Sequence, residues 1–348
     1  MASGLNVGIT RDERFLKHKT GHHHPEHPKR LDALYRMLDQ FFTDRLTAIA
    51  AEPATLEQVE RIHSPSYIKR ILKTAEQRIT SLAPDTPISA DSCFAAWLAA
   101  GACVKGIDCL MTKRSDAFFA FIRPPGHHAL PDKASGFCIF NNIAIAAQYA
   151  LDRYSLKRIL VIDWDIHHGN GIHDIFYDSE NVLYLSTHDP MMYPYTGEME
   201  QTGTGKGEGY TVNIPILREF TDADMVYLYQ EILQPLVSEY RPQLIMVAAG
   251  FDAHAGDPIG RSLLTRAFYA GVTRLLMNLS AATDNPPLFY ALEGGYHQRA
   301  LADSICAILT ELTEGPTLMA PLSLSPGQAA KNLAAQVKTI HSPYGILC

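Results

Sequence analysis

Residues 163–171 read DWDIHHGNG, a stretch in which side chains able to bind a metal alternate along the chain. Asp163, Asp165 and His167 are two residues apart, so in an extended strand they project to the same face. Two carboxylates at the end of an apolar segment are costly to desolvate unless a cation lies beside them. An isolated aspartate at a strand end often caps a helix or forms a turn. Three alternating residues that can bind a metal favour a metal site instead.

A catalytic zinc site usually has three protein ligands and one open position, so a further ligand is expected from another part of the chain. Asp252 and His254, in AAGFDAHAGD, both follow an apolar segment and are rival candidates. We favour Asp252, because the stretch from Gly250 to Gly256 is typical of a loop that turns just past a strand. Two carboxylates and one imidazole can hold zinc or iron(II), so the donor types leave the metal open.

Two adjacent histidines, His127 and His128, follow the stiff Pro-Pro-Gly corner of RPPGHH. A single histidine is usually a packed or surface residue. Two in tandem on a rigid loop, beside a metal site, are better interpreted as groups that transfer protons. Each needs a partner on its far ring nitrogen to fix the tautomer, and Asp163 and Asn170 are available for this role.

Tyr296 follows a pair of glycines in EGGYH, residues 293–297. The glycines allow the chain to turn tightly and bring the phenol toward the metal. A phenol donates a hydrogen bond and suits an oxygen on which negative charge develops. Most of the 16 tyrosines are expected to pack by their rings in the core.

These motifs follow a repeated pattern of short apolar segments and longer amphipathic ones. Near-continuous apolar runs predict strands buried on both faces of a parallel sheet, at residues 117–122, 158–164, 182–187, 212–215, 244–249 and 288–292. Helices are predicted at residues 92–111, 141–154, 221–240, 265–280 and 299–313. The alternation indicates an α/β sandwich with helices on both faces of the sheet. Ligands of open α/β sheets bind beyond the carboxyl ends of the strands, where the polar motifs lie. We expect one domain over residues 1–348.

Composition excludes several classes of protein. Apolar residues make up 47% of the 348 and charged residues 19%, which rules out intrinsic disorder and fibrous structure. The net charge of -7 disfavours a nucleic-acid binder. We see no secretory signal and no segment apolar and long enough to cross a bilayer. The six scattered cysteines are expected to be free thiols in a cytoplasmic protein. The histidine-rich stretch at residues 21–30 is expected to be a solvated or pocket-lining loop.

The ordered set RPPGHH, ASGFCIFNN, DWDIHHGNG, YLSTH, AGFDAHAGDP and LEGGY resembles the histone deacetylase superfamily, zinc-dependent amidohydrolases with an arginase-like fold. The resemblance runs from HPKRL near residue 30 to residue 296 and implies a three-layer sandwich around a mainly parallel sheet. Asn170 and the LEGGY wording are more similar to class II and bacterial deacetylase-like amidohydrolases than to class I, which carries Asp at that position.

The resemblance implies a role for each motif residue. Zinc would be bound by Asp165, His167 and Asp252. His127 would pair with Asp163, and His128 with Asn170, His128 being the main general base and acid. Tyr296 would donate to the substrate carbonyl.

The resemblance also implies residues that bind substrate and a second ion. Gly136 and Phe137 match the pocket segment, with Phe137 as one wall of an acyl-lysine tunnel. His188 is expected at the rim, and Asp85 matches a rim aspartate that holds a peptide backbone. A structural potassium ion is expected near Asp163, Asp165, His167 and Ser186, partly through backbone carbonyls.

The expected function is hydrolysis of N-acetyl-lysine or a similar acylated amine, on a peptide or a small molecule, with no nucleic-acid or membrane partner and a homo-oligomer left open. The alternative is an acetylpolyamine amidohydrolase. Polyamine-selective relatives can place an acid near the tunnel mouth, and the matching residue here, Ile259, is apolar and favours acyl-lysine. A binding protein without turnover is disfavoured by the intact metal set and Tyr296. An arginase-like binuclear manganese hydrolase is disfavoured by HHGNG, which lacks the bridging carboxylates.

Overall fold

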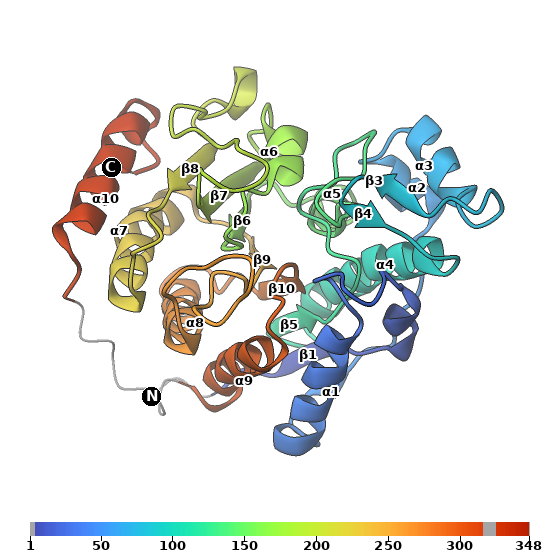
Figure 1. Cartoon of the computed structure of the whole chain (residues 1–348). Helices are drawn as coiled ribbons and strands as arrows, with labels where there is room; N and C mark the ends of the chain where they lie inside the picture. Colours follow the sequence, from blue (N-terminus) through green and yellow to red (C-terminus); the bar gives the residue numbers. More distant parts are fainter. Residues whose placement is uncertain (1–3, 316–324, 348) are drawn as a thin grey trace.

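The computed structural model describes residues 4–315 and 325–347. It is built around one eight-stranded sheet with helices packed around it, and Figure 1 shows how these elements are arranged. Its strands are β1 (Val7–Thr10), β2 (Thr47–Ala48), β5 (Ala117–Ala120), β6 (Ile159–Asp163), β7 (Val182–His188), β8 (Thr211–Pro215), β9 (Leu244–Ala249) and β10 (Leu288–Leu292). The order across the sheet is β2-β1-β5-β10-β9-β6-β7-β8, and every pairing is parallel. A separate antiparallel pair joins β3 (Ser81–Ala83) to β4 (Thr86–Pro87).

Helices cover both faces of the sheet. The α-helices of the described residues are α1 (Lys29–Phe41), α2 (Leu56–Glu60), α3 (Pro65–Leu72), α4 (Ser92–Met111), α5 (Asn142–Tyr154), α6 (Asn170–Phe176), α7 (Asp222–Tyr240), α8 (Arg266–Ala281), α9 (Gln298–Glu314) and α10 (Gln328–His341), of which α2 and α3 lie beside β3 and β4. The connections through α5 and α6 run across the sheet from β5 to β6 and β7, and those through α7 and α8 run in the opposite direction from β8 to β9 and β10. Because such crossovers are right-handed, the two pairs of helices lie on opposite faces of the sheet. Helices α1, α9, α8, α7 and α10 contact one another in series, and α4 contacts α5 on the other side. This is the expected three-layer α/β sandwich.

The parallel sheet brings the sequence motifs together. RPPGHH follows β5, DWDIHHGNG begins in β6, AGFDAHAGD begins in β9 and EGGYH follows β10. These four strands are neighbours in the order β5-β10-β9-β6. Because their carboxyl ends meet at one edge of the sheet, motifs up to 170 residues apart lie side by side there.

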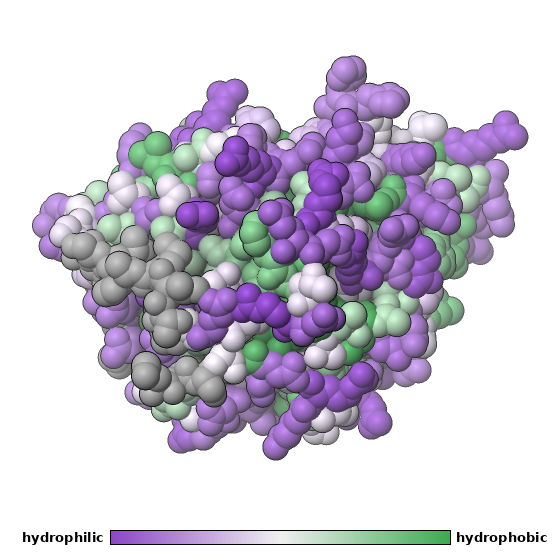
Figure 2. All heavy atoms as spheres, turned by 90° about the horizontal axis from the view of Figure 1, so that it is seen from below, coloured by the Kyte–Doolittle hydropathy of each residue, from purple (hydrophilic) through white to green (hydrophobic). Residues whose placement is uncertain are grey.

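Helix α4 corrects one expectation from the sequence. It is long and apolar enough to span a membrane by length and composition, although no such segment was predicted. In the fold, however, 72% of its most apolar stretch is buried, against α5 and strands β1, β5 and β10. Packing inside the protein therefore accounts for its apolar character. Seen from below, hydrophilic side chains cover most of the surface and hydrophobic ones form smaller areas between them (Figure 2).

The cysteines agree with the expectation of free thiols over the part of the chain that the structure describes. Cys93, Cys103, Cys109, Cys138 and Cys306 are all unpaired. Cys348 lies outside the described residues.

The buried His63 predicts a stability that depends on pH. Its Nδ1–H donates to the Leu130 carbonyl at 3.1 Å, and its Nε2 accepts from the Asn141 amide at 2.9 Å, so the ring is held neutral. Burial lowers the pKa of His63 from 6.5 to about 4. Between pH 6.5 and about 4, His63 is therefore protonated in the unfolded chain but neutral in the folded chain. The free energy of unfolding should fall by about 2 kcal/mol from this residue as the pH drops from about 7 to about 5.

Urea unfolding of the protein at a series of pH values measures this slope. The slope is the change in the free energy of unfolding with pH. In His63→Gln it should fall by the contribution of roughly one proton taken up on unfolding, whatever the stability of the variant at neutral pH. An unchanged slope in the variant would show that His63 is not the titrating group.

Candidate active site

Asp165, His167 and Asp252 converge at the carboxyl edge of the sheet. One ligand atom from each lies within 4.8 Å of the others. His167 Nδ1 is 2.9 Å from Asp165 Oδ1 and 3.1 Å from Asp252 Oδ2. Both carboxylates are fully buried and the imidazole nearly so. One imidazole and two carboxylates at this spacing fit a divalent transition metal such as zinc.

His254, the rival ligand in the sequence, does not join this group. Its Nδ1 accepts a hydrogen bond from the Gly256 amide at 3.0 Å, and its ring is partly exposed. It lines a surface pocket of about 350 Å³ together with His297 and Asp303. The group of possible metal ligands therefore contains Asp252 and not His254.

Two glycines leave the space in which the carboxylates lie. A Cβ on Gly250 would stand 2.1 Å from Asp165 Oδ2, and one on Gly294 would stand 2.1 Å from Asp252 Oδ2. Main-chain amides orient the carboxylates from the other side: Gly294 donates to Asp165 at 2.9 Å and Ile166 donates to Asp252 at 3.1 Å. The backbone thus holds both acids in fixed positions.

The electrostatics of the group also favour a bound cation. Burial and the neighbouring Asp165 carboxylate raise the pKa of Asp252 to about 7. Burial alone would lower the pKa of His167, but the Asp252 and Asp165 carboxylates raise it well above its ordinary value. Acids that repel one another and an imidazole drawn toward protonation indicate a site that attracts positive charge.

The two histidines of RPPGHH pair as expected. His127 Nδ1 lies 3.1 Å from Asp163 Oδ2, and His128 Nδ1 lies 2.8 Å from Asn170 Oδ1. Their ring centroids are 3.9 Å apart. His128 also faces the metal group, with its ring centroid 6.0 Å from that of His167.

Environment separates the pKa values of these two histidines. Burial acts to lower the pKa of His127, but the carboxylates of Asp165 and Asp163 raise it to about 10. Burial lowers the pKa of His128 well below its ordinary value, and the neighbouring imidazoles lower it further. The neighbouring carboxylates therefore favour the charged form of His127, and burial favours the neutral form of His128.

Tyr296 follows the turn after β10, next to Phe137 and Arg30. Its amide donates to Asp257 Oδ2 at 2.6 Å, which holds the turn after Gly294 and Gly295. Its ring packs edge-on to Phe137 with centroids 5.8 Å apart, and the Arg30 guanidinium lies 5.0 Å from its centroid. Burial and the Asp252 and Asp165 carboxylates raise the pKa of Tyr296 well above 10. The phenol therefore stays protonated and able to donate.

The predicted pocket segment borders the same place. Gly136 has φ +55°, and a Cβ there would lie 2.2 Å from the His128 ring, so glycine is required. Phe137 also has a positive φ, of 68°, and its ring is partly exposed. Asp85 Oδ2 accepts from the Gly136 amide at 3.2 Å. The ring of His24, in the histidine-rich loop, lies 4.6 Å from that of Phe137, so this loop borders the pocket segment.

Comparisons with known proteins agree with this geometry. Residues 24–312 match the histone deacetylase domain. This chain belongs to the histone deacetylase family.

Its relatives come from all domains of life. The probable deacetylase of Archaeoglobus fulgidus is 38% identical over 296 residues, which cover 83% of this chain and 81% of that protein. The histone deacetylase-like amidohydrolase of Pseudomonas aeruginosa is 35% identical over 293 residues, 83% of this chain and 77% of that protein. The polyamine deacetylase HDAC10 of Mus musculus is 36% identical over 92% of this chain, which spans only 49% of that protein.

A solved structure confirms the fold of this histone deacetylase family member. The HDA15 HD domain superposes with a TM-score of 0.91 at 33% identity, covering 97% of this chain and 95% of that domain. The arginase-like sandwich predicted from the sequence is therefore confirmed, and membership of the histone deacetylase family supports hydrolase activity.

His188 corrects another expectation for this family member. It is fully buried, not at the rim. Its Nδ1 lies 2.9 Å from Ser186 Oγ and its Nε2–H donates to the Gly197 carbonyl at 2.9 Å. Both ring nitrogens are used within the fold, so His188 does not face substrate.

The residues expected to hold potassium lie together, but their role stays a prediction. Asp163, the last residue of β6, is the register partner of Ser186 in β7, and both are fully buried. Ile259 is partly exposed, in a loop held by a 2.9 Å hydrogen bond from its amide to Asp257 Oδ1.

Glu293 is a buried residue of the site that the sequence reasoning missed. Its Oε2 accepts from the amides of Gly126 at 2.6 Å and His127 at 3.1 Å, so it fixes the loop that carries both histidines. Burial raises the pKa of Glu293 to about 7. A carboxylate directly after a fully apolar strand is the same signal that identified Asp163.

Two more missed groups support the site. The buried Glu26 binds the guanidinium groups of Arg123 and Arg30, and Arg30 Nε donates to the Gly295 carbonyl at 2.6 Å. This network ties the start of RPPGHH to the turn before Tyr296. Tyr193 packs edge-on to His128 with centroids 5.0 Å apart.

Asn170 offers a test through the pH profile of activity. Asn170→Asp would place a carboxylate 2.8 Å from His128 Nδ1. An opposite charge favours the imidazolium, so the pKa of His128 should rise. A base that stays protonated to higher pH is inactive over a wider acidic range. We expect the acidic limb of the kcat/KM profile to move to higher pH, while an unmoved limb would show that His128 is not the base.

Proposed function

We propose that this family member is a zinc-dependent deacylase that hydrolyses the amide of N-acetyl-lysine, giving a free amine and a carboxylate. The observation that carries the proposal is the convergence of Asp165, His167 and Asp252 beside a neutral His128 and a protonated Tyr296. Zinc bound by these three ligands would act as a Lewis acid that polarises the amide carbonyl and makes water easier to deprotonate.

The chain's own residues would move the protons. The Nδ1–H of His128 donates to Asn170, which leaves Nε2 free to take a proton from the attacking water. The protonated His128 then delivers this proton to the nitrogen of the leaving amine as the C–N bond breaks. The charged His127, held by Asp163, balances negative charge that develops nearby. Tyr296 donates to the carbonyl oxygen as it becomes anionic.

A small acylated polyamine is the second candidate substrate, because two relatives are named polyamine deacetylases. The apolar Ile259 favours acyl-lysine, since a cationic polyamine chain would gain from an acid at that position. The test compares kcat/KM for an acetyl-lysine peptide, longer acyl-lysine peptides and N-acetylputrescine. A strong preference for acetylputrescine would overturn the choice of acyl-lysine.

The metal is tested separately. Protein stripped of metal should be inactive and should regain activity with one equivalent of zinc per chain. Reconstitution with iron(II) under anaerobic conditions tests the other metal that this donor set accepts. Protein that holds one zinc and cleaves none of the acylated amines would contradict the proposed function.

A further inference from the structure

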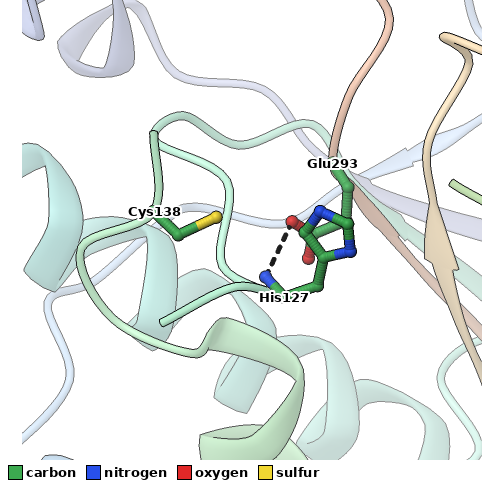
Figure 3. Close-up of side chains that lie close together, drawn as sticks. All are labelled: His127, Cys138 and Glu293. Carbon is green, nitrogen blue, oxygen red and sulfur yellow. Dashed lines mark hydrogen bonds between the residues drawn. The ribbon is translucent and has the colours of Figure 1, made fainter. Parts of the chain in front are cut away.

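A second cluster of possible metal ligands lies beside the candidate active site. His127, Cys138 and Glu293 each offer one ligand atom, and these atoms lie within 4.8 Å of one another (Figure 3). The three side chains are buried and come from separate segments, after β5, in the pocket segment and after β10. Figure 3 shows the Cys138 sulfur on the side of its chain that faces the carboxylate and the imidazole.

The cluster contains a polar atom without a partner. Glu293 Oε2 accepts two main-chain amides, but Oε1 is fully buried and has no hydrogen-bond partner among the residues that the structure describes. A carboxylate oxygen buried in this way costs free energy unless a cation or a donor meets it. The Cys138 thiol makes a weak contact with the Gly136 carbonyl at 3.2 Å, which a cation can replace.

The donor types identify the kind of ion. A thiolate, an imidazole and a carboxylate together suit zinc and other thiophilic divalent ions, and the thiolate disfavours magnesium, calcium and potassium. We propose that His127, Cys138 and Glu293 form a second, inhibitory site for a thiophilic divalent cation, distinct from the group of Asp165, His167 and Asp252.

Inhibition follows from the identity of one ligand. A cation bound to the His127 imidazole would occupy a ring that the proposed function uses to balance charge and hold the proton relay. The ion displaces the ring proton of His127 and the thiol proton of Cys138, so the charged imidazole that the proposed function uses beside Asp163 is lost. Excess zinc should therefore lower kcat more than it raises KM. This consequence rests on the proposed function, whereas binding of the second ion does not.

The test titrates cadmium into enzyme already loaded with one equivalent of zinc. A cadmium ion bound to a thiolate produces an ultraviolet charge-transfer band, which the cysteine-free group of Asp165, His167 and Asp252 cannot give. The wild type should show this band and bind a second ion. Cys138→Ser keeps a hydroxyl for the Gly136 carbonyl but should lose both the band and the second ion. Cys109→Ser is the matched control, because Cys109 is also buried but lies in α4, where its thiol contacts Ser115 beyond the end of that helix.

Glu293→Gln provides an independent arm, since it can still accept the two amides but lacks the charge, and it should weaken second-ion binding at least tenfold. The proposal is overturned if the wild type binds no second ion, or if Cys138→Ser keeps the band. Zinc in excess should inhibit the wild type and Cys109→Ser, and inhibit Cys138→Ser much less; equal inhibition of all three would also contradict it. The two proposals can fail separately. If Cys138→Ser loses the band but the wild type has no deacylase activity, the proposed function is rejected and the second metal site is still supported.

Discussion

Tyr296→Phe is expected to lower kcat by roughly 10²–10³-fold, because it removes one donor to the developing oxyanion. The ring should keep its contacts with Phe137 and Arg30, since the substitution deletes only the hydroxyl. Tyr296 is not in the metal group, so the zinc content should remain close to that of the wild type. Steady-state kinetics on an acetyl-lysine peptide, together with metal analysis of the same sample, measure both quantities.

Tyr195→Phe is the matched control, because it also removes only a tyrosine hydroxyl. A change in the core, such as Phe289→Tyr, would disturb packing and is unsuitable. Tyr195 is 73% exposed and its loss of a hydroxyl should leave kcat unchanged. Unchanged turnover in Tyr296→Phe would remove the oxyanion role from this residue. A variant that loses its zinc as well would assign Tyr296 a role in metal binding instead.

His128→Ala is expected to lower kcat by about 10²–10⁴-fold, the usual contribution of a positioned general base. Burial keeps this imidazole neutral, and its bond to Asn170 aims Nε2 away from the partner. The substitution leaves the ligands Asp165, His167 and Asp252 in place, so one zinc should still bind. The measurement is kcat and zinc content across a pH series.

His254→Ala is the matched control for His128→Ala. His254 follows the same strand as Asp252 but lies in a surface pocket. Its removal should change neither the zinc content nor kcat. A loss of zinc in His254→Ala would show that the rival ligand does take part.

Much of the fold follows from the local pattern of apolar residues. The helix at 92–111 and the strands at 244–249 and 288–292 have the predicted bounds. Both strands are continuous apolar runs, and the helix is apolar over most of its length. Strands β1 and β2 were missed. They contain four and two residues, and their place at the sheet edge is set by pairing with distant segments rather than by their own pattern.

The part of the site that could be predicted consists of metal-ligand residues that follow apolar strands. Asp165, His167 and Asp252 carry this signal, and the parallel sheet brings them together. His188 carries the same signal and was misplaced. Strand β7 ends at His188, and the following loop brings the Gly197 carbonyl onto its ring. That loop contact joins residues nine apart through a turn whose path the local pattern does not specify.

The position of the zinc ion is the most direct measurement. Anomalous diffraction at the zinc edge, from crystals of protein loaded with one equivalent of zinc, locates the ion without reference to activity. The account predicts a single strong peak among the side chains of Asp165, His167 and Asp252. A peak elsewhere in the protein, or three side chains that surround no ordered ion, would contradict it.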